Sequence, residues 1–103
     1  VLGMGDDGHT ASFFPGGDRL AEALDPDGSA RVLPMHAPDA GEPRITLTLP
    51  TLLQTRALYL LVAGEKKRDV LADARLGLGA ARDYPVRAVL TQQHVPVAVY
   101  WCP

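Results

Sequence analysis

The residues best suited to chemistry lie in one short polar segment near the start of the chain, Gly3-Met4-Gly5-Asp6-Asp7-Gly8-His9-Thr10-Ala11-Ser12. Asp7 and His9 stand two residues apart across a glycine, so the carboxylate can reach the imidazole. Such a carboxylate fixes the tautomer of the imidazole and suits it to act as a general base. We therefore interpret His9 and Asp7 as candidate catalytic residues.

The same segment has features of an anion-binding site. Gly5 allows a ligand to approach the backbone closely. Thr10 and Ser12 add hydroxyl groups and backbone donors near a possible helix start, where anions bind well. Gly5 and Thr10 are therefore candidate ligand-binding residues. The competing interpretation is an ordinary strand-to-helix turn with a solvent-facing histidine. Spacing alone favours that plain turn, so the residue pattern leaves both interpretations open.

The elements that must position these residues follow from hydrophobic periodicity. The apolar residues 1–4 are typical of the end of a buried strand, and further strands are predicted at 31–36, 45–49, 58–63 and 95–101. Helices are predicted at 10–14, 19–24, 51–56 and 85–90, and after residues 65–68 along the stripe Val70, Leu71 and Ala74. This alternation predicts an α/β fold, Rossmann-like, with a mostly parallel sheet flanked by helices. Ligands bind such sheets where the strands end, which is where His9 lies.

Several local features are predicted inside this framework. Asp18 is predicted to cap the helix at 19–24, and Pro50 suits the first turn of the helix that follows it. The continuous apolar run 58–63 is typical of a strand that is buried on both faces. Residues 25–28 are typical of a turn. The segments 37–43 and 76–83, which contain glycine or proline, are predicted to be loop and linker.

Composition excludes several classes of protein. The 103 residues carry 10 Lys and Arg against 12 Asp and Glu, a net charge of −2, which is not the basic excess of a nucleic-acid-binding protein. Apolar runs such as 57–63 are far shorter than the ~20 residues of a membrane helix. The single cysteine, Cys102, excludes an intrachain disulfide and fits a reducing, cytoplasmic setting. The sequence sets no oligomeric state.

Both ends of the chain are apolar instead of polar and frayed. The chain begins inside a predicted strand and stops directly after another, at Trp101-Cys102-Pro103. We therefore expect residues 1–103 to be the C-terminal part of a single domain whose N-terminal half is missing, and we expect little activity from this part alone. A naturally short chain is the alternative.

Three segments in order resemble one enzyme family. Residues 3–16, Gly-Met-Gly-Asp-Asp-Gly-His-Thr-Ala-Ser-Phe-Phe-Pro-Gly, resemble the signature of the 6-phosphogluconolactonases. Residues 44–53, which begin Arg-Ile-Thr-Leu-Thr-Leu-Pro, are similar to a second segment of that family. Residues 61–67, Leu-Val-Ala-Gly-Glu-Lys-Lys, are similar to a third segment of the family, in which a strand ends in a turn with a glycine and a lysine follows three residues later. The resemblance extends from Val1 to about Trp101.

The resemblance implies hydrolysis of 6-phospho-D-glucono-1,5-lactone to 6-phospho-D-gluconate in the oxidative pentose phosphate pathway, without a metal or an organic cofactor. It implies that His9 is the general base on water and that Asp7 orients it. Backbone amides around residues 3–5 or at Thr10 are candidates to stabilise the oxyanion. The substrate is then a small sugar-phosphate lactone, and no nucleic acid or membrane takes part.

The resemblance also suggests which cations bind the 6-phosphate. Lys67 stands three residues after Gly64, as the family's lysine does, and Lys66 is the alternate if the match slips by one residue. Arg44 is a further candidate. For either lysine, a solvated side chain in the first turn of a helix is the plain alternative, and for Arg44 it is a surface ion pair. The family's phosphate loop of the Ser-Gly-Gly-Ser type does not occur in this sequence, so we expect only part of the phosphate site.

Two other functions stay open. The glucosamine-6-phosphate deaminases belong to the same superfamily, but they follow Asp-Gly-His with a run containing glutamate, where this chain has Phe13-Phe14-Pro15. A non-catalytic module that binds sugar phosphates is the second alternative. His36 and His94 are expected to be exposed, Cys102 to be a packing residue, and no metal-ligand spacing links the histidines.

Overall fold

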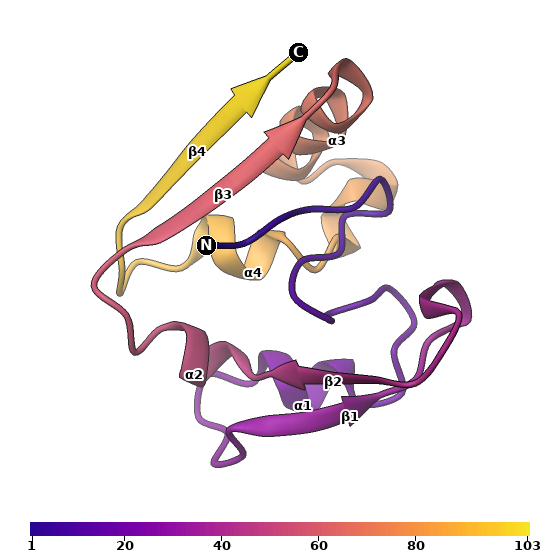
Figure 1. Cartoon of the computed structure of the whole chain (residues 1–103), viewed down its shortest axis with the longest axis vertical. Helices are drawn as coiled ribbons and strands as arrows, with labels where there is room; N and C mark the ends of the chain where they lie inside the picture. Colours follow the sequence, from indigo (N-terminus) through magenta and orange to yellow (C-terminus); the bar gives the residue numbers. More distant parts are fainter.

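The structure is a computed structural model that describes all 103 residues. Its strands are β1 (Val32–Met35), β2 (Arg44–Leu47), β3 (Leu58–Ala63) and β4 (Val97–Cys102). Its α-helices are α1 (Leu20–Leu24), α2 (Leu49–Leu52), α3 (Glu65–Leu76) and α4 (Arg87–Thr91), with short 3-10 helices at Pro38–Ala40 and Gly79–Asp83. Figure 1 shows two small sheets, β3 with β4 and β1 with β2, joined through α2. None of the helices has the length and hydrophobicity that crossing a membrane requires.

Parallel pairing organises the half of the molecule that carries the predicted site. β3 and β4 run parallel in register from the pair Leu58 and Val97 to the pair Ala63 and Cys102, and α3 lies in the connection between them. On the other side of β3, Leu2 forms a parallel bridge to Leu60. The amide of Leu2 donates to the carbonyl of Tyr59 at 2.7 Å. The α/β class is thus confirmed. Of the strand predicted at residues 1–4, only the isolated bridge at Leu2 forms.

The second sheet is antiparallel, which the sequence did not indicate. β1 and β2 pair from Val32 with Leu47 to Met35 with Arg44. The short connection 36–43 explains this pairing, because parallel neighbours need a crossover of a dozen or more residues while antiparallel neighbours do not. The predicted loop at 37–43 contains the 3-10 helix Pro38–Ala40.

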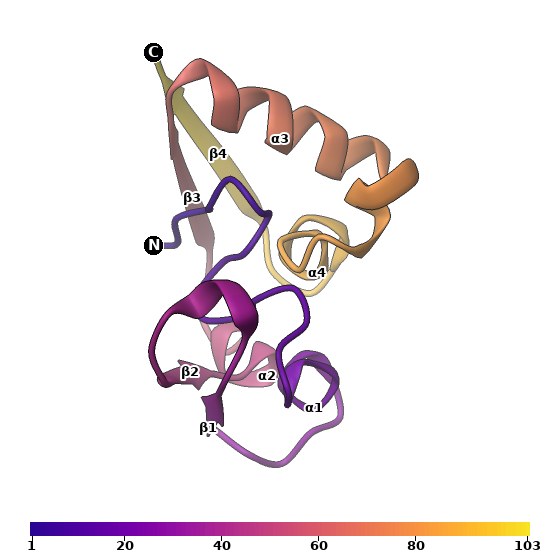
Figure 2. The ribbon, with the colours of Figure 1, turned by 90° about the vertical axis from the view of Figure 1, so that its right-hand side faces the viewer.

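β3 is buried on one face only, so the prediction of burial on both faces is wrong. Leu58, Leu60 and Val62 are buried, while Tyr59, Leu61 and Ala63 are exposed. Figure 2 views β3 and β4 nearly edge-on and shows α3 and α4 on the same side of both strands. We call the side without helices the open face; its exposed residues are Tyr59, Leu61, Ala63, Tyr100 and Cys102.

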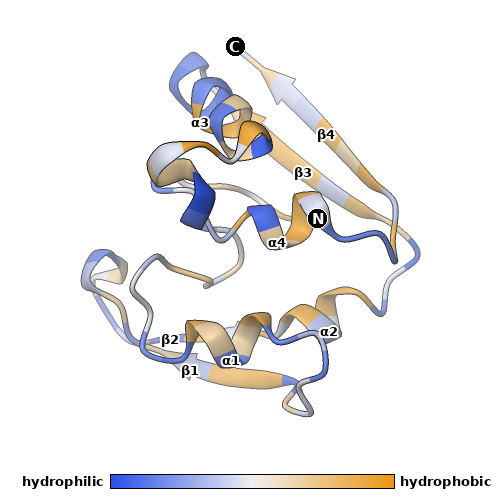
Figure 3. Cartoon of the chain, turned by 180° about the vertical axis from the view of Figure 1, so that it is seen from behind, coloured by the Kyte–Doolittle hydropathy of each residue, from blue (hydrophilic) through white to orange (hydrophobic).

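Two buried clusters hold the predicted site segment at both of its ends. One cluster contains Met4 with Leu60, Val62, Leu71, Ala74 and Val86. The other contains Phe13 and Phe14 with residues of β1, α1 and the start of β3. Figure 3 shows the apolar β3 behind helices whose outer turns are hydrophilic. Because the segment between Met4 and Phe13 joins the two clusters, packing at each end limits its movement.

The helix predicted at residues 10–14 does not form. These residues make a tight turn, in which the amide of Phe13 donates to the carbonyl of Thr10 at 2.9 Å. Ala11 has a φ of 50°, a left-handed conformation that cannot continue a right-handed helix. The amide of Ser12 donates to Thr46 Oγ1 in β2 at 3.1 Å, which ties the turn to the other sheet.

The cap predicted at Asp18 is also wrong. Helix α1 begins at Leu20 and has no side-chain cap. The Asp18 carboxylate instead accepts a hydrogen bond from the amide of His36 at 2.9 Å. Apart from the strand predicted at residues 1–4, the other predicted helices and strands are confirmed with shifts at their ends. The helix predicted at 51–56 lies at Leu49–Leu52, with Pro50 in its first turn, and the linker 76–83 contains the 3-10 helix Gly79–Asp83.

Candidate active site

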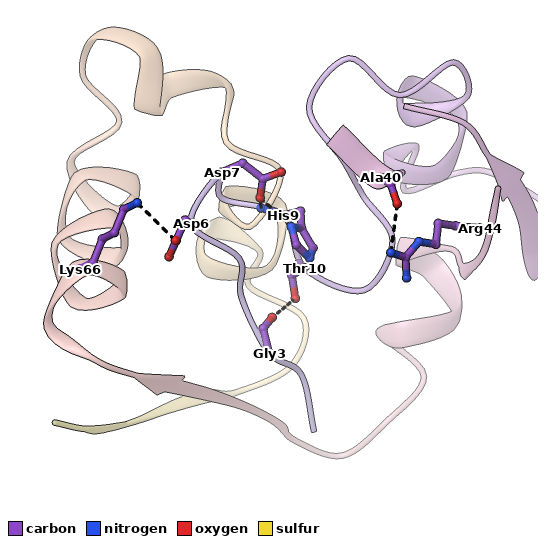
Figure 4. A network of polar contacts seen from close by, with 8 residues as sticks. All are labelled: Gly3, Asp6, Asp7, His9, Thr10, Ala40, Arg44 and Lys66. Atoms are coloured by element: carbon purple, nitrogen blue, oxygen red, sulfur yellow. Dashed lines mark hydrogen bonds and ion pairs between the residues drawn. The ribbon is translucent and has the colours of Figure 1, made fainter. Parts of the chain in front are cut away.

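His9 and Asp7 are in direct contact. Nδ1 of His9 lies 2.6 Å from Oδ1 of Asp7, and the amide of His9 donates to the same oxygen at 3.1 Å (Figure 4). An ionised carboxylate only accepts hydrogen bonds, so this contact favours the neutral tautomer with the proton on Nδ1 and the lone pair on Nε2. Nε2 has no partner in the chain and is not buried. The side chains are 31% and 29% exposed, so water can reach this nitrogen.

The turn that presents His9 is shaped by two glycines. Gly8 has a φ of 81°, and a Cβ there would collide with the ring of Tyr84. Its carbonyl accepts a hydrogen bond from the amide of Val86 at 2.9 Å. A Cβ at Gly5 would collide with the His9 ring. Any larger residue at either position would therefore displace the turn. Sequence reasoning missed the role of Tyr84, which no local pattern indicates.

Lys67 and His9 line the same hollow, although they are far apart in the sequence. This hollow has a volume of about 440 Å³ and lies between the N-terminal segment, β3 and the first turn of α3. Gly5, Ala11 and Ala63 are among its other lining residues. An imidazole and a cation thus line one space that is large enough for a small ligand, at the end of β3 where parallel sheets bind ligands.

The neighbouring lysine faces a different partner. Nζ of Lys66 lies 3.4 Å from Oδ2 of Asp6, and its side chain is 78% exposed. Lys66 does not line the hollow, whereas Lys67 is half-buried at its wall. Of the two lysines that the sequence left open, the structure therefore brings only Lys67 together with His9.

Arg44 lies apart from this hollow. Its Nη2 donates to the carbonyl of Ala40 at 3.1 Å, as Figure 4 shows. Its guanidinium lies 5.6 Å from the centre of the Phe14 ring, and the Phe14 ring stacks on His9 at 4.3 Å between centres. Arg44 and His9 thus both contact the ring of Phe14.

Thr10 and Gly5 have polar groups that already have partners. Thr10 is fully buried, and its hydroxyl donates to the carbonyl of Gly3 at 2.7 Å. The amide of Gly5 donates to the carbonyl of His9 at 2.9 Å. The amides of Gly3, Met4 and Thr10 have no partner within the chain. Among the predicted oxyanion donors, these three amides are the ones left free.

The remaining candidates lie elsewhere. His36 and His94 are exposed, as predicted, and His36 pairs with Asp18. Cys102 is exposed on the open face, so its prediction as a packing residue is wrong, because no helix covers that side of β4. No group of three His, Cys, Asp or Glu side chains is arranged to hold a metal ion.

The fold and the site define a Rossmann-like α/β protein with a ligand hollow at the end of its parallel strands. Residues 1–101 match the family model of the glucosamine-6-phosphate isomerases/6-phosphogluconolactonase. The chain belongs to this family.

Its relatives point to one branch of the family. The 6-phosphogluconolactonase of Rhizobium meliloti (strain 1021) is 50% identical over 103 residues, which are 100% of this chain and 44% of that protein. That of Pseudomonas aeruginosa is 43% identical, over 100% of this chain and 42% of that protein. The crystal structure of a 6-phosphogluconolactonase from Shewanella baltica OS155 superposes with a TM-score of 0.81 at 40% identity, over 98% of this chain and 42% of that one.

The chain spans less than half the length of the curated relatives that it matches. A monomeric glucosamine-6-phosphate deaminase superposes with a TM-score of 0.50 at 18% identity, over 95% of this chain and 43% of that one, which is a likeness of fold alone.

Proposed function

We propose that this chain carries the base-bearing part of an enzyme that hydrolyses 6-phospho-D-glucono-1,5-lactone to 6-phospho-D-gluconate. One observation carries the proposal: a histidine held by a carboxylate shares a hollow with a lysine. Ester hydrolysis needs a base for water, and the phosphate of this substrate needs a cation. The lactonase names of relatives that are up to 50% identical support the same reaction.

In the proposed mechanism, His9 removes a proton from water. Asp7 keeps the proton of the imidazole on Nδ1, so Nε2 is free to accept one. The resulting hydroxide adds to the lactone carbonyl and forms a tetrahedral oxyanion, which the free amides of Gly3 and Met4 are available to bind. The ring C–O bond then breaks, and the proton on Nε2 passes to the departing ring oxygen. The products are one carboxylic acid and one hydroxyl, so no cofactor is needed.

We assign the substrate phosphate to Lys67, which lines the hollow, and Arg44 is the second candidate cation. Arg44 does not line the hollow, and its guanidinium would have to leave the carbonyl of Ala40 to contact the substrate. Gly5 contributes through its lack of a side chain. Thr10 is fully buried and does not line the hollow, so it contributes by holding the carbonyl of Gly3 through its hydroxyl.

We further propose that residues 1–103 are the C-terminal part of a single lactonase domain. The proposal is supported by relatives of more than twice this length. A single cysteine fits work in the reducing cytoplasm.

The test is lactone hydrolysis by two proteins: the 103-residue chain, and a chimera in which these residues replace the matching segment of the Rhizobium meliloti relative. Rates are corrected for spontaneous hydrolysis. We expect the chimera to be active and the chain alone nearly inactive.

In the chimera, His9→Ala should lower kcat by roughly 10²–10⁴-fold, the usual contribution of a positioned base. Asp7→Asn should have an effect of similar size, because it disturbs the tautomer. Release of ammonia from glucosamine 6-phosphate without lactone hydrolysis would contradict the proposal. An inactive, folded chimera would contradict it as well.

A further inference from the structure

His9 is in contact with an aromatic ring that belongs to the buried core. The rings of His9 and Phe14 are stacked, with centres 4.3 Å apart and planes inclined by 26°. Phe14 is only 4% exposed and packs in the cluster with β1, α1 and the start of β3. The imidazole, which is 31% exposed, therefore rests on a rigid surface on one side while its free nitrogen meets solvent.

Three contacts together leave the imidazole one orientation. Asp7 holds Nδ1, the Cα of Gly5 lies against the edge that carries Nδ1 and Cε1, and Phe14 lies against a ring face. The hydrogen bond to Asp7 alone would still allow small rotations about the Cα–Cβ and Cβ–Cγ bonds of His9 that tilt the ring while Nδ1 stays near the carboxylate. The Phe14 ring prevents these rotations, because a tilted imidazole would overlap it.

We infer that Phe14 is a positioning residue for His9, and that it fixes the direction in which Nε2 faces the substrate hollow. The effect of Phe14 on catalysis rests on the proposed function, whereas its effect on the orientation of the His9 ring does not. A base that is misdirected by a small distance loses much of its effect, since proton transfer needs the reacting atoms in contact and aligned.

Arg44 extends this arrangement to the second sheet. Its guanidinium lies over the Phe14 ring, 5.6 Å from the ring centre, and also donates to the carbonyl of Ala40 in the same buried cluster. A cation near an aromatic ring is attracted to it. Phe14 is thus held by core packing and by the first residue of β2, so the base is coupled to a sheet that contributes no residue to the hollow with Lys67.

The chain offers a matched control in the adjacent phenylalanine. Phe13 is fully buried in the same cluster as Phe14, yet it makes no aromatic contact with His9. Phe13→Leu and Phe14→Leu therefore remove the same atoms from the same core. Only the second variant removes the ring under the base, and Phe14→Tyr keeps that ring.

The first measurement is the NMR signals of the His9 ring protons in the 103-residue chain. Protons over the face of an aromatic ring are shifted upfield, so Phe14→Leu should move these signals downfield. Phe13→Leu and Phe14→Tyr should leave them nearly unchanged. Equal movement in both leucine variants, or none in Phe14→Leu, would overturn the inference whatever the protein catalyses.

The second measurement is lactone kinetics in the chimera. Phe14→Leu should lower kcat about 10- to 100-fold with little change in KM, the size expected for a misplaced catalytic group. Phe14→Tyr should recover most of that loss, and Phe13→Leu should stay close to the parent. A rise in KM alone, or equal losses in both leucine variants, would contradict positioning. If the parent chimera does not hydrolyse the lactone, the proposed function fails, while the NMR result still decides whether Phe14 positions His9.

Discussion

The Cα of Gly5 lies directly against the imidazole of His9, so that a Cβ at this position would collide with Nδ1 and Cε1 of the ring. The same Cβ would lie 2.8 Å from Oδ1 of Asp7. A glycine at residue 5 is therefore required for the contact between the Asp7 carboxylate and the His9 imidazole.

We predict that Gly5→Ala separates His9 from Asp7. Overpacking of this kind costs typically 1–3 kcal/mol, which should appear as a lower free energy of unfolding in urea titrations. The His9 ring signals should also move in NMR spectra. Gly3→Ala is the control, because a Cβ at Gly3 meets nothing within 4 Å. If Gly3→Ala and Gly5→Ala destabilise the chain equally, the close approach is not the cause.

The two adjacent lysines should differ in the kinetics of the chimera. Lys67→Ala should raise KM for the phosphorylated lactone about tenfold or more, the size of a lost hydrogen bond to a charged group. The same variant should change little for unphosphorylated gluconolactone. Lys66→Ala should leave both substrates unaffected, because Lys66 pairs with Asp6 outside the hollow. A KM effect that follows Lys66 instead would reverse the assignment.

The pair Asp18 and His36 should make stability depend on pH in the acid range. The amide of His36 donates to Asp18 Oδ1 and holds the pKa of Asp18 below its ordinary value of 3.8, with a smaller contribution from the His36 imidazole. A lowered pKa in the folded state stabilises the protein above the unfolded pKa, and this contribution is lost as the pH falls through the folded pKa.

The difference in Tm between the parent chain and Asp18→Asn should therefore be present at neutral pH, decrease as the pH falls below the ordinary pKa of aspartate, and vanish only below the lowered pKa of folded Asp18. Thermal unfolding followed by circular dichroism between pH 2 and pH 7 measures it. Asp39→Asn is the control, since Asp39 accepts no hydrogen bond. A Tm difference that grows on acidification would contradict the predicted direction of the pH dependence.

The open face should cause the 103-residue chain to self-associate. Leu61 and Tyr100 are 52% and 57% exposed and lie opposite each other on β3 and β4. Contiguous apolar surface of this kind favours association. We expect the sedimentation coefficient of the chain to rise with concentration, and Leu61→Thr with Tyr100→Thr to suppress the rise.

The control for this experiment replaces two leucines outside the open face. Leu76 and Leu78 are 69% and 73% exposed at the end of α3. If Leu76→Thr with Leu78→Thr suppresses association equally well, the open face is not the contact surface.

The sequence alone predicted those features that local interactions determine. Asp7, Gly8 and His9 are contiguous, so a turn of the backbone is enough to bring the acid to the base, and the strand β3 and helix α3 follow from periodicity within each segment. The resemblance to the lactonase family likewise rested on contiguous motifs. The helix predicted at residues 10–14 failed because a contact with Thr46 in β2, distant in the sequence, decided the path of the chain.

Tertiary structure decided everything that joins distant segments. It determined which of Lys66 and Lys67 shares a hollow with His9, because that depends on how the first turn of α3 faces the N-terminal segment. It also left β3 exposed on one face, since all the helices that cover it lie on the other. A run of apolar residues indicates that a strand can be buried, but only the packing of other elements determines which of its faces are covered.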